Sequence, residues 1–181
     1  MRVVWELDPG GASGRAPVFD ALCRVRRSHI LTKRYLTGLV IAAAVVVLDL
    51  WTKRYAALTF KGNPVEIIPG FFGFTYVENP GGAFGVFQNG GQVIGIAAII
   101  ITGVVLVALA ADRPRIETVA LGFVLGGAIG NLVDRFARGP GIIDGPVIDW
   151  IELWIIPTFN IADTAVTVAV GLLLIHAWRS R

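Results

Sequence analysis

Charged side chains are scarce in this sequence. Asp, Glu, Lys and Arg make up 16% of its 181 residues, hydrophobic residues make up 55%, and the mean hydropathy is +0.69. Soluble domains carry about 25% charged residues, so a soluble fold of this composition would expose too much apolar surface. The scarcity excludes intrinsic disorder of the whole chain, most soluble enzymes and nucleic-acid-binding proteins. It indicates a membrane protein.

Cysteine and histidine are rare as well. The single cysteine, Cys23, excludes an intrachain disulfide, and no apolar run precedes it as the signal of a lipoprotein would require. His29 and His176 lie far apart, with no second type of metal ligand beside either of them. We therefore expect no metal site and no cofactor.

Long apolar runs dominate what is present. Four of them approach the length of about 20 helical residues that spans a bilayer, at residues 35–51, 93–111, 118–133 and 161–178. Residues 1–30 are rich in Gly, Arg and Pro and show no sustained period, which predicts a disordered basic tail. We expect this tail to be followed by an all-α membrane domain of four transmembrane helices over residues 31–181.

The basic residues predict how the chain is oriented. Eleven lysines and arginines lie before the first run, in the link between the second and third runs, and after the fourth run. Five lie in the two segments on the opposite side. Because the cytoplasmic side of membrane proteins is enriched in Lys and Arg, both termini of this multi-pass protein are expected in the cytoplasm.

The two external segments differ in character. Residues 58–76 contain aromatic and β-branched residues broken by Gly and Pro, a pattern that predicts a small β-hairpin or cradle at the outer membrane surface. Residues 135–159 are expected to form a loop with Trp150, Trp154 and Phe159 at interfacial level. Either segment could close over a cleft as a flap.

The third apolar run carries glycines at every fourth position, Gly122, Gly126 and Gly130. This spacing lets the backbone of a neighbouring helix approach closely, as in the small-xxx-small pattern of membrane helices. The packing role is sufficient for these three glycines, and we assign no chemistry to them.

Polar residues gather where the spans reach the outer face. Because polar groups at this depth are costly, they usually mark a site or form pairs. The ends of three apolar runs and the loop between the third and fourth runs bring the following residues to this level: Asp49, Asn131, Asp134, Arg135, Asp144, Asp149, Glu152, Asn160 and Asp163.

Several of these residues also have a local interpretation. Asp49 and Lys53 have the i,i+4 spacing of a surface ion pair. Asn160 fits the N-cap of the fourth helix, with Asp163 in its first turn favoured by the helix dipole. Asp134 could simply end the third helix at the interface.

Taken together, the acids fit peptide hydrolysis by two carboxylates. Two nearby carboxyl groups share a proton, so the ionised one can activate water while the protonated one polarises the scissile carbonyl. Asp149 and Asp163 come from separate elements and can meet across a cleft. The histidines and the cysteine lie on the other side of the membrane. A proton or ion path is the alternative, but it would distribute acids through the bilayer, whereas these gather at one face.

Five segments carry a resemblance to a known family. They read DLWTK (49–53), VENPGGAFG (77–85), GGAIGNLVDR (126–135), VIDWI (147–151) and PTFNIAD (157–163), and they occur in order within residues 36–178. In this respect the chain resembles bacterial lipoprotein signal peptidase, also called signal peptidase II.

The resemblance implies a four-helix aspartyl endopeptidase of the bacterial inner membrane, with an extracytoplasmic β-cradle and an active site near the outer leaflet. Its substrates would be prolipoproteins whose lipobox cysteine carries a diacylglyceryl group, and cleavage would occur on the N-terminal side of that cysteine. Membrane lipids would surround the enzyme, and globomycin-type antibiotics would block it. Asp149 and Asp163 fall on the catalytic positions. The positions that shape the site or hold substrate are Asp49, Lys53, Asn79, Gly81, Gly127, Asn131, Arg135 and Asn160.

The segment 139–146 departs from many members as a small insertion, and it supplies a rival acid, Asp144. We prefer Asp149 because its segment matches the family and is partly apolar, whereas Asp144 lies in a predicted exposed turn. Since a helix N-terminus favours an anion, Asp163 is expected to be ionised and Asp149 to hold the shared proton. Phe84 and Trp150 are expected to line the apolar part of the cleft.

Overall fold

The computed structural model describes residues 17–81, 90–139 and 141–181, with side chains from residue 33 onward. The first part of the expected tail, the Cys23 side chain and Phe84 lie outside the described residues. The division into a tail and a membrane domain therefore stays a prediction.

Within the described residues, four helices are long and apolar enough to cross a membrane, as predicted. They are α1 (Pro17–Thr59), α2 (Gly91–Leu109), α3 (Arg115–Ala137) and α4 (Ile161–Arg179). Helix α1 begins at Pro17, well inside the segment expected to be a tail. Proline favours the first position of a helix, and neither Gly nor Pro follows it before Gly38, so nothing interrupts the helix on its way to the membrane span.

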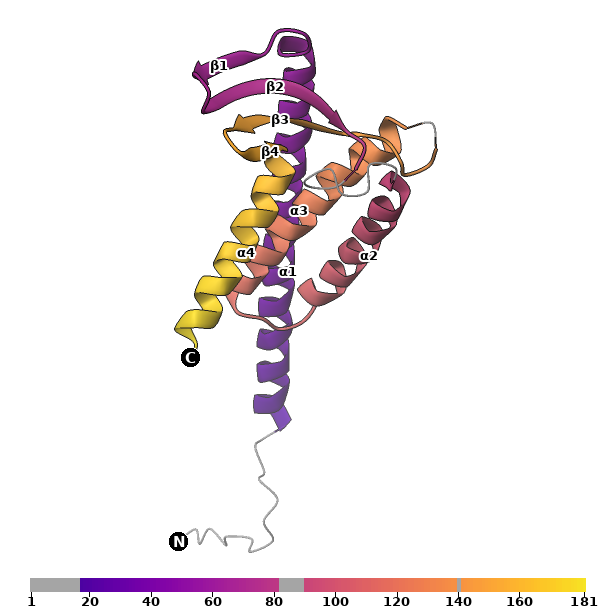
Figure 1. Ribbon diagram of the computed structural model, residues 1–181. Coiled ribbons are helices and arrows are strands. Elements are labelled where there is room, and N and C mark those ends of the chain that lie inside the picture. The colour runs from indigo at the N-terminus through magenta and orange to yellow at the C-terminus, as the bar shows by residue number, and fades with distance from the viewer. Residues whose placement is uncertain (1–16, 82–89, 140) are drawn as a thin grey trace, which may run out of the picture.

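A four-stranded antiparallel sheet lies at one end of the helices, and the C-terminus lies at the other (Figure 1). The expected hairpin is present as β1 (Val65–Ile68) and β2 (Phe72–Asn79). The expected loop over 135–159 is wrong in part, because it contains β3 (Val147–Leu153) and β4 (Ile156–Phe159). A lone hairpin is marginal in stability. Strand β2 also pairs with β3, from Phe72 opposite Leu153 to Asn79 opposite Val147, and this pairing joins the hairpin to the rest of the sheet.

Helix α3 is the centre of the bundle and packs against the other three helices. A Cβ atom at Gly122 would lie 2.8 Å from the carbonyl oxygen of Gly38, and one at Gly126 would lie 2.8 Å from that of Ala42. The predicted glycine ridge therefore does allow α1 to approach closely. Large hydrophobic side chains on the outer faces are exposed, such as Val107 at 76%, as expected of helices that face lipid.

Candidate active site

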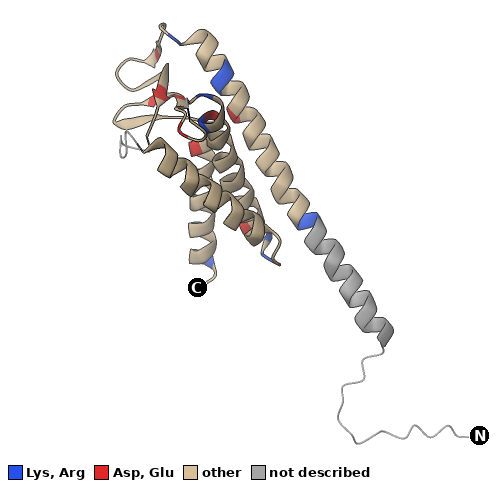
Figure 2. Cartoon of the chain, turned by 90° about the vertical axis from the view of Figure 1, so that its right-hand side faces the viewer, with Lys and Arg blue, Asp and Glu red and all other residues tan. Residues whose placement is uncertain are grey.

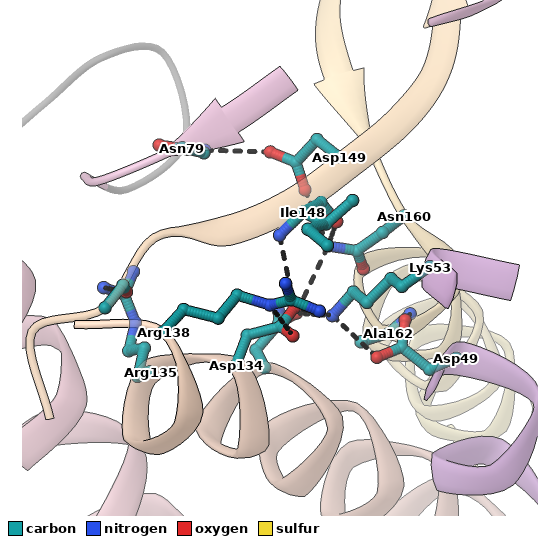
Figure 3. A network of polar contacts seen from close by, with 12 residues as sticks. Asp49, Lys53, Asn79, Asp134, Arg135, Arg138, Ile148, Asp149, Asn160 and Ala162 are labelled. Carbon is teal, nitrogen blue, oxygen red and sulfur yellow. Dashed lines mark hydrogen bonds and ion pairs between the residues drawn. The ribbon is translucent and has the colours of Figure 1, made fainter. Parts of the chain in front are cut away.

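Asp149 lies on β3 at the junction of the sheet and the bundle, and it is only 3% exposed. Two amides hold its carboxylate, one from each side. Asn79 at the end of β2 donates from Nδ2 to Oδ2 at 2.9 Å, and Asn160 donates from Nδ2 to Oδ1 at 2.7 Å (Figure 3). The carboxyl group is therefore fixed in orientation although it is removed from bulk water.

Asp163 lies in the first turn of α4, where Asn160 is the N-cap. The Asn160 side chain accepts a hydrogen bond from the Asp163 backbone N–H at 2.9 Å, and the Asp163 Oδ2 accepts one from the Asn160 backbone N–H at 3.3 Å. This reciprocal pair is a capping box, so the local interpretation of these two residues is confirmed. The other oxygen, Oδ1, accepts from Asn131 Nδ2 on α3 at 2.9 Å.

Asn160 therefore joins the two carboxylates. It is fully buried and contacts Asp149 through its side chain and Asp163 through its backbone. Burial raises the pKa of Asp149 to about 6, against the opposing effect of the Asn79 amide, and the negative charge of Asp163 adds to the rise. A carboxyl group with this pKa holds its proton more readily than an ordinary aspartate, which is the direction expected for the proton-bearing partner.

A buried lysine lies beneath this pair. Lys53 Nζ lies 2.7 Å from Asp49 Oδ2 and 3.0 Å from Asp134 Oδ2, and it donates to Asn131 Oδ1 at 2.9 Å (Figure 3). Lys53 is 1% exposed and Asp49 is fully buried. The alternative of a surface pair between Asp49 and Lys53 is therefore wrong, because the packing of α3 and α4 encloses both side chains.

Asp49 and Asp134 perform matching tasks within this group. Asp49 Oδ1 accepts a hydrogen bond from the backbone N–H of Ala162 at 2.9 Å, and Asp134 Oδ2 accepts one from that of Ile148 at 3.2 Å. Ala162 immediately precedes Asp163, and Ile148 immediately precedes Asp149. Each buried carboxylate thus holds the backbone beside one member of the pair, and Lys53 binds both.

Asp134 is the residue that the sequence reasoning missed as part of the site. It is 1% exposed and also accepts from Arg138 Nε at 2.8 Å, a pair with i,i+4 spacing. The sequence offered two signals for Asp134. One was its i,i+4 spacing to Arg138, and the other was its position three residues after Asn131, on the same helix face. Both are common at helix ends, so they did not distinguish a buried network from a terminal charge.

Arg135 fixes the chain that follows β2. It is 3% exposed, and its Nη2 donates to the carbonyl oxygen of Gly81 at 2.8 Å, while Nη1 donates to that of Gly145 at 3.3 Å. The Gly81 N–H in turn donates to Asn79 Oδ1 at 3.0 Å. Arg135 and Gly81 therefore orient Asn79 toward Asp149.

A cleft of about 480 Å³ opens beside the carboxylates. Both Asp149 and Asp163 line it, and Ile94, Ala98 and Ile101 of α2 form part of its apolar wall. Polar residues and glycines also line the cleft, namely Asn79, Gly81, Gly127, Asn131 and Arg135. Among the described residues, no group of three or more His, Cys, Asp and Glu side chains could hold a metal ion.

The positions of Trp150 and Asp144 bear on two expectations from the sequence, that Trp150 lines the cleft and that Asp144 is a rival acid. Trp150 is not among the lining residues and packs against Phe74, with ring centroids 5.5 Å apart. Successive side chains of a strand point to opposite faces, so Asp149 and Trp150 cannot both face the cleft. Asp144 does not line it either, and its carboxylate accepts from the Gly141 N–H at 3.0 Å within its own loop.

The profile of the family described as Signal peptidase (SPase) II matches residues 41–179. A protein from Symbiobacterium thermophilum named lipoprotein signal peptidase is 40% identical over 142 residues, covering 77% of this chain and 92% of that relative. One of the same name from Rhodococcus jostii is 35% identical over 170 residues, covering 93% and 79%. A solved bacterial membrane enzyme superposes with a TM-score of 0.68 at 31% identity, covering 79% and 88%. The chain therefore belongs to the signal peptidase II family.

Proposed function

We propose that this membrane peptidase is an aspartic endopeptidase that removes the signal peptide from diacylglyceryl-modified prolipoproteins. Cleavage would occur on the N-terminal side of the lipidated cysteine. The observation that carries the proposal is the pair Asp149 and Asp163, which line one cleft and share Asn160 as a hydrogen-bond partner. Membership of the family supports the substrate class, and the paired carboxylates support the mechanism.

In the proposed reaction, Asp163 is ionised at the helix N-terminus and Asp149 carries the proton. Asp163 removes a proton from a water molecule as the water oxygen attacks the scissile carbonyl carbon, while Asp149 donates its proton to the carbonyl oxygen. The tetrahedral diol then breaks at the C–N bond. The proton on Asp163 passes to the leaving nitrogen, and the diol returns a proton to Asp149 as the new carboxyl group forms.

The remaining site residues would orient this pair and frame the substrate. Lys53, Asp49 and Asn131 would hold the carboxylates from beneath, and Asn160 would fix their relative orientation. The substrate peptide would pass the polar side of the cleft, formed by Asn79, Gly81, Gly127 and Arg135. The apolar wall on α2 would accept the acyl chains of the modified cysteine. Globomycin-type antibiotics would block the enzyme by filling the same cleft.

We further propose an orientation with both termini in the cytoplasm and the active site near the outer leaflet of the inner membrane. The excess of Lys and Arg at the end of the bundle that carries the C-terminus supports it. The sheet would then lie at the outer surface, where the anchored acyl chains of a prolipoprotein bring its scissile bond close to the cleft.

The test is cleavage of a purified prolipoprotein by the purified full-length protein in detergent micelles. Two substrates are compared, one with diacylglycerol on the lipobox cysteine and one with that cysteine unmodified. We expect cleavage of the modified substrate. The mass of the product, measured by mass spectrometry, should match a chain that begins at the lipidated cysteine. Cleavage of both substrates at equal rates, or at another bond, would contradict the proposal.

A further inference from the structure

A second cavity, of about 560 Å³, lies at the end of the bundle opposite the sheet. Its lining among the described residues comes from α1 and α3, and none of these residues belongs to the site described above. The α1 residues are Lys33, Arg34 and Thr37, and the α3 residues are Arg115, Thr118 and Val119. Three of the six carry a positive charge and none is acidic.

Two of the three cations are available to a ligand. Neither Lys33 nor Arg115 forms an ion pair with another described side chain. Arg34 has a structural task, because its Nη1 donates to Asp112 Oδ1 at 2.8 Å and to the carbonyl oxygen of Arg113 at 2.7 Å. It thereby holds the loop between α2 and α3 against α1, which keeps the cavity walls together.

The backbone adds to the positive field. Helix α3 begins at the cavity, and its N-cap, Pro114, makes no side-chain capping hydrogen bond. The free N–H groups and the dipole of a helix N-terminus favour an anion. Glu117 in the same turn is already paired with Arg113, with Nη1 and Oε2 3.2 Å apart. The first turn of α3 therefore reinforces the two free cations instead of neutralising them.

The cavity also lies at a defined depth. The apolar runs of α1 and α3 begin just after Arg34 and shortly after Arg115, so in a bilayer Lys33 and Arg115 would lie where the hydrocarbon core ends and the lipid headgroups start. Figure 2 shows basic segments at the start of the described part of α1 and at the loop between α2 and α3, at this same end. Phosphate groups of lipids are concentrated at this level.

We propose that this cavity binds the phosphate group of an acidic phospholipid. Lys33 and Arg115 attract the phosphate, the N-terminus of α3 contributes N–H donors, and Val119 contacts the first methylene groups of the acyl chains. Basic pockets between membrane helices recognise lipid headgroups in this way. Inorganic phosphate shares the anionic chemistry, but it has no acyl chains to anchor it between two membrane spans.

The test is native mass spectrometry of the full-length protein in detergent micelles, titrated with phosphatidylglycerol, with phosphatidylcholine or with inorganic phosphate. The variant is Lys33→Gln/Arg115→Gln, and the matched control is Arg179→Gln/Arg181→Gln, which removes two exposed charges at the same end but outside the cavity. Each cation near a membrane surface is worth about fivefold in affinity, so we expect about 25-fold weaker binding of phosphatidylglycerol by the variant. The control should bind as the unmodified chain does.

Three results would overturn the assignment. These are equal binding by the variant and the unmodified chain, an equal loss in the control, and displacement of the lipid by millimolar inorganic phosphate. Phosphatidylcholine, whose phosphate is compensated by its choline, should bind at least about fivefold more weakly than phosphatidylglycerol. Prolipoprotein cleavage in micelles should be the same for the variant and the control, which establishes that both proteins are folded.

Discussion

Replacing Lys53 by methionine isolates the contribution of the one buried cation that binds both Asp49 and Asp134. Methionine preserves the approximate length of the side chain and removes its charge, so Asp49 remains buried without a counterion while Asp134 keeps its pair with Arg138. Breaking a buried ion pair costs about 3–5 kcal/mol because the remaining charge is uncompensated. We expect the free energy of unfolding, measured by denaturant titration in mixed micelles, to fall by about this amount.

The same substitution should also reduce catalysis. Lys53 donates to Asn131 at 2.9 Å, and Asn131 donates to Asp163 at 2.9 Å. Without the lysine the Asn131 amide oxygen keeps only the longer hydrogen bond from Asn160 Nδ2, at 3.2 Å, so Asn131 holds Asp163 less firmly in position. Displacement of a reacting group by about 1 Å costs on the order of 100-fold, and we expect kcat for prolipoprotein cleavage to fall by about that factor.

Lys61→Met is the matched control, since Lys61 is exposed and lies 3.6 Å from Glu78 in a surface pair. Such pairs contribute about 0–1 kcal/mol, so stability should change little and activity not at all. In the double variant Lys53→Met/Asp49→Asn the uncompensated charge is removed, and this variant should be at least ~0.5 kcal/mol more stable than additivity of the single variants predicts. Strict additivity, or an unchanged Lys53→Met protein, would refute the reasoning.

Two further predictions concern protonation and packing. In the proposed mechanism Asp149 acts in its protonated form, and burial raises its pKa to about 6, so kcat/KM should fall as pH rises through that value. Asn79→Leu removes an amide that stabilises the Asp149 anion, so the falling limb should move to higher pH. A limb that stays in place would count against this role. Gly127→Ala would put a Cβ 2.5 Å from the carbonyl oxygen of Ala162 and should lower both stability and activity, whereas Gly103→Ala on α2, with nothing within 4 Å, should be neutral in unfolding and cleavage assays.

Local patterns in the sequence accounted for most of the fold. The four spans follow from continuous apolar runs, and the β1–β2 hairpin follows from β-branched and aromatic residues around Gly70, which has a φ of 68°. The strands β3 and β4 escaped prediction because their pairing is non-local. Strand β3 pairs with β2 across about 70 intervening residues, and Gly and Pro residues near it made the segment resemble a loop.

The residues that the structure brings together at the cleft were predicted where residue type carried the signal and missed where burial carried it. Asp149, Asp163 and Asn160 stood out as polar residues at the membrane boundary, one of them at a helix start. Asp134 belonged to the same group of polar residues but was given no role in the site, because an aspartate near the end of a helix is usually a solvated charge. Its burial arises from the approach of α1 and β3, which bring Lys53 and the Ile148 N–H to it, and neither contact is encoded in the neighbouring sequence.

The central claim is that two carboxylates, Asp149 and Asp163, perform the hydrolysis. The most direct measurement is the rate of cleavage of diacylglyceryl-modified prolipoprotein by Asp149→Asn and by Asp163→Asn, with Asp144→Asn as the control from the neighbouring loop. General acid–base groups contribute about 10²–10⁴ in rate, so each of the first two variants should lose at least about 100-fold in kcat while the control retains full activity. Retained activity in either dyad variant, or equal loss in the control, would contradict the account.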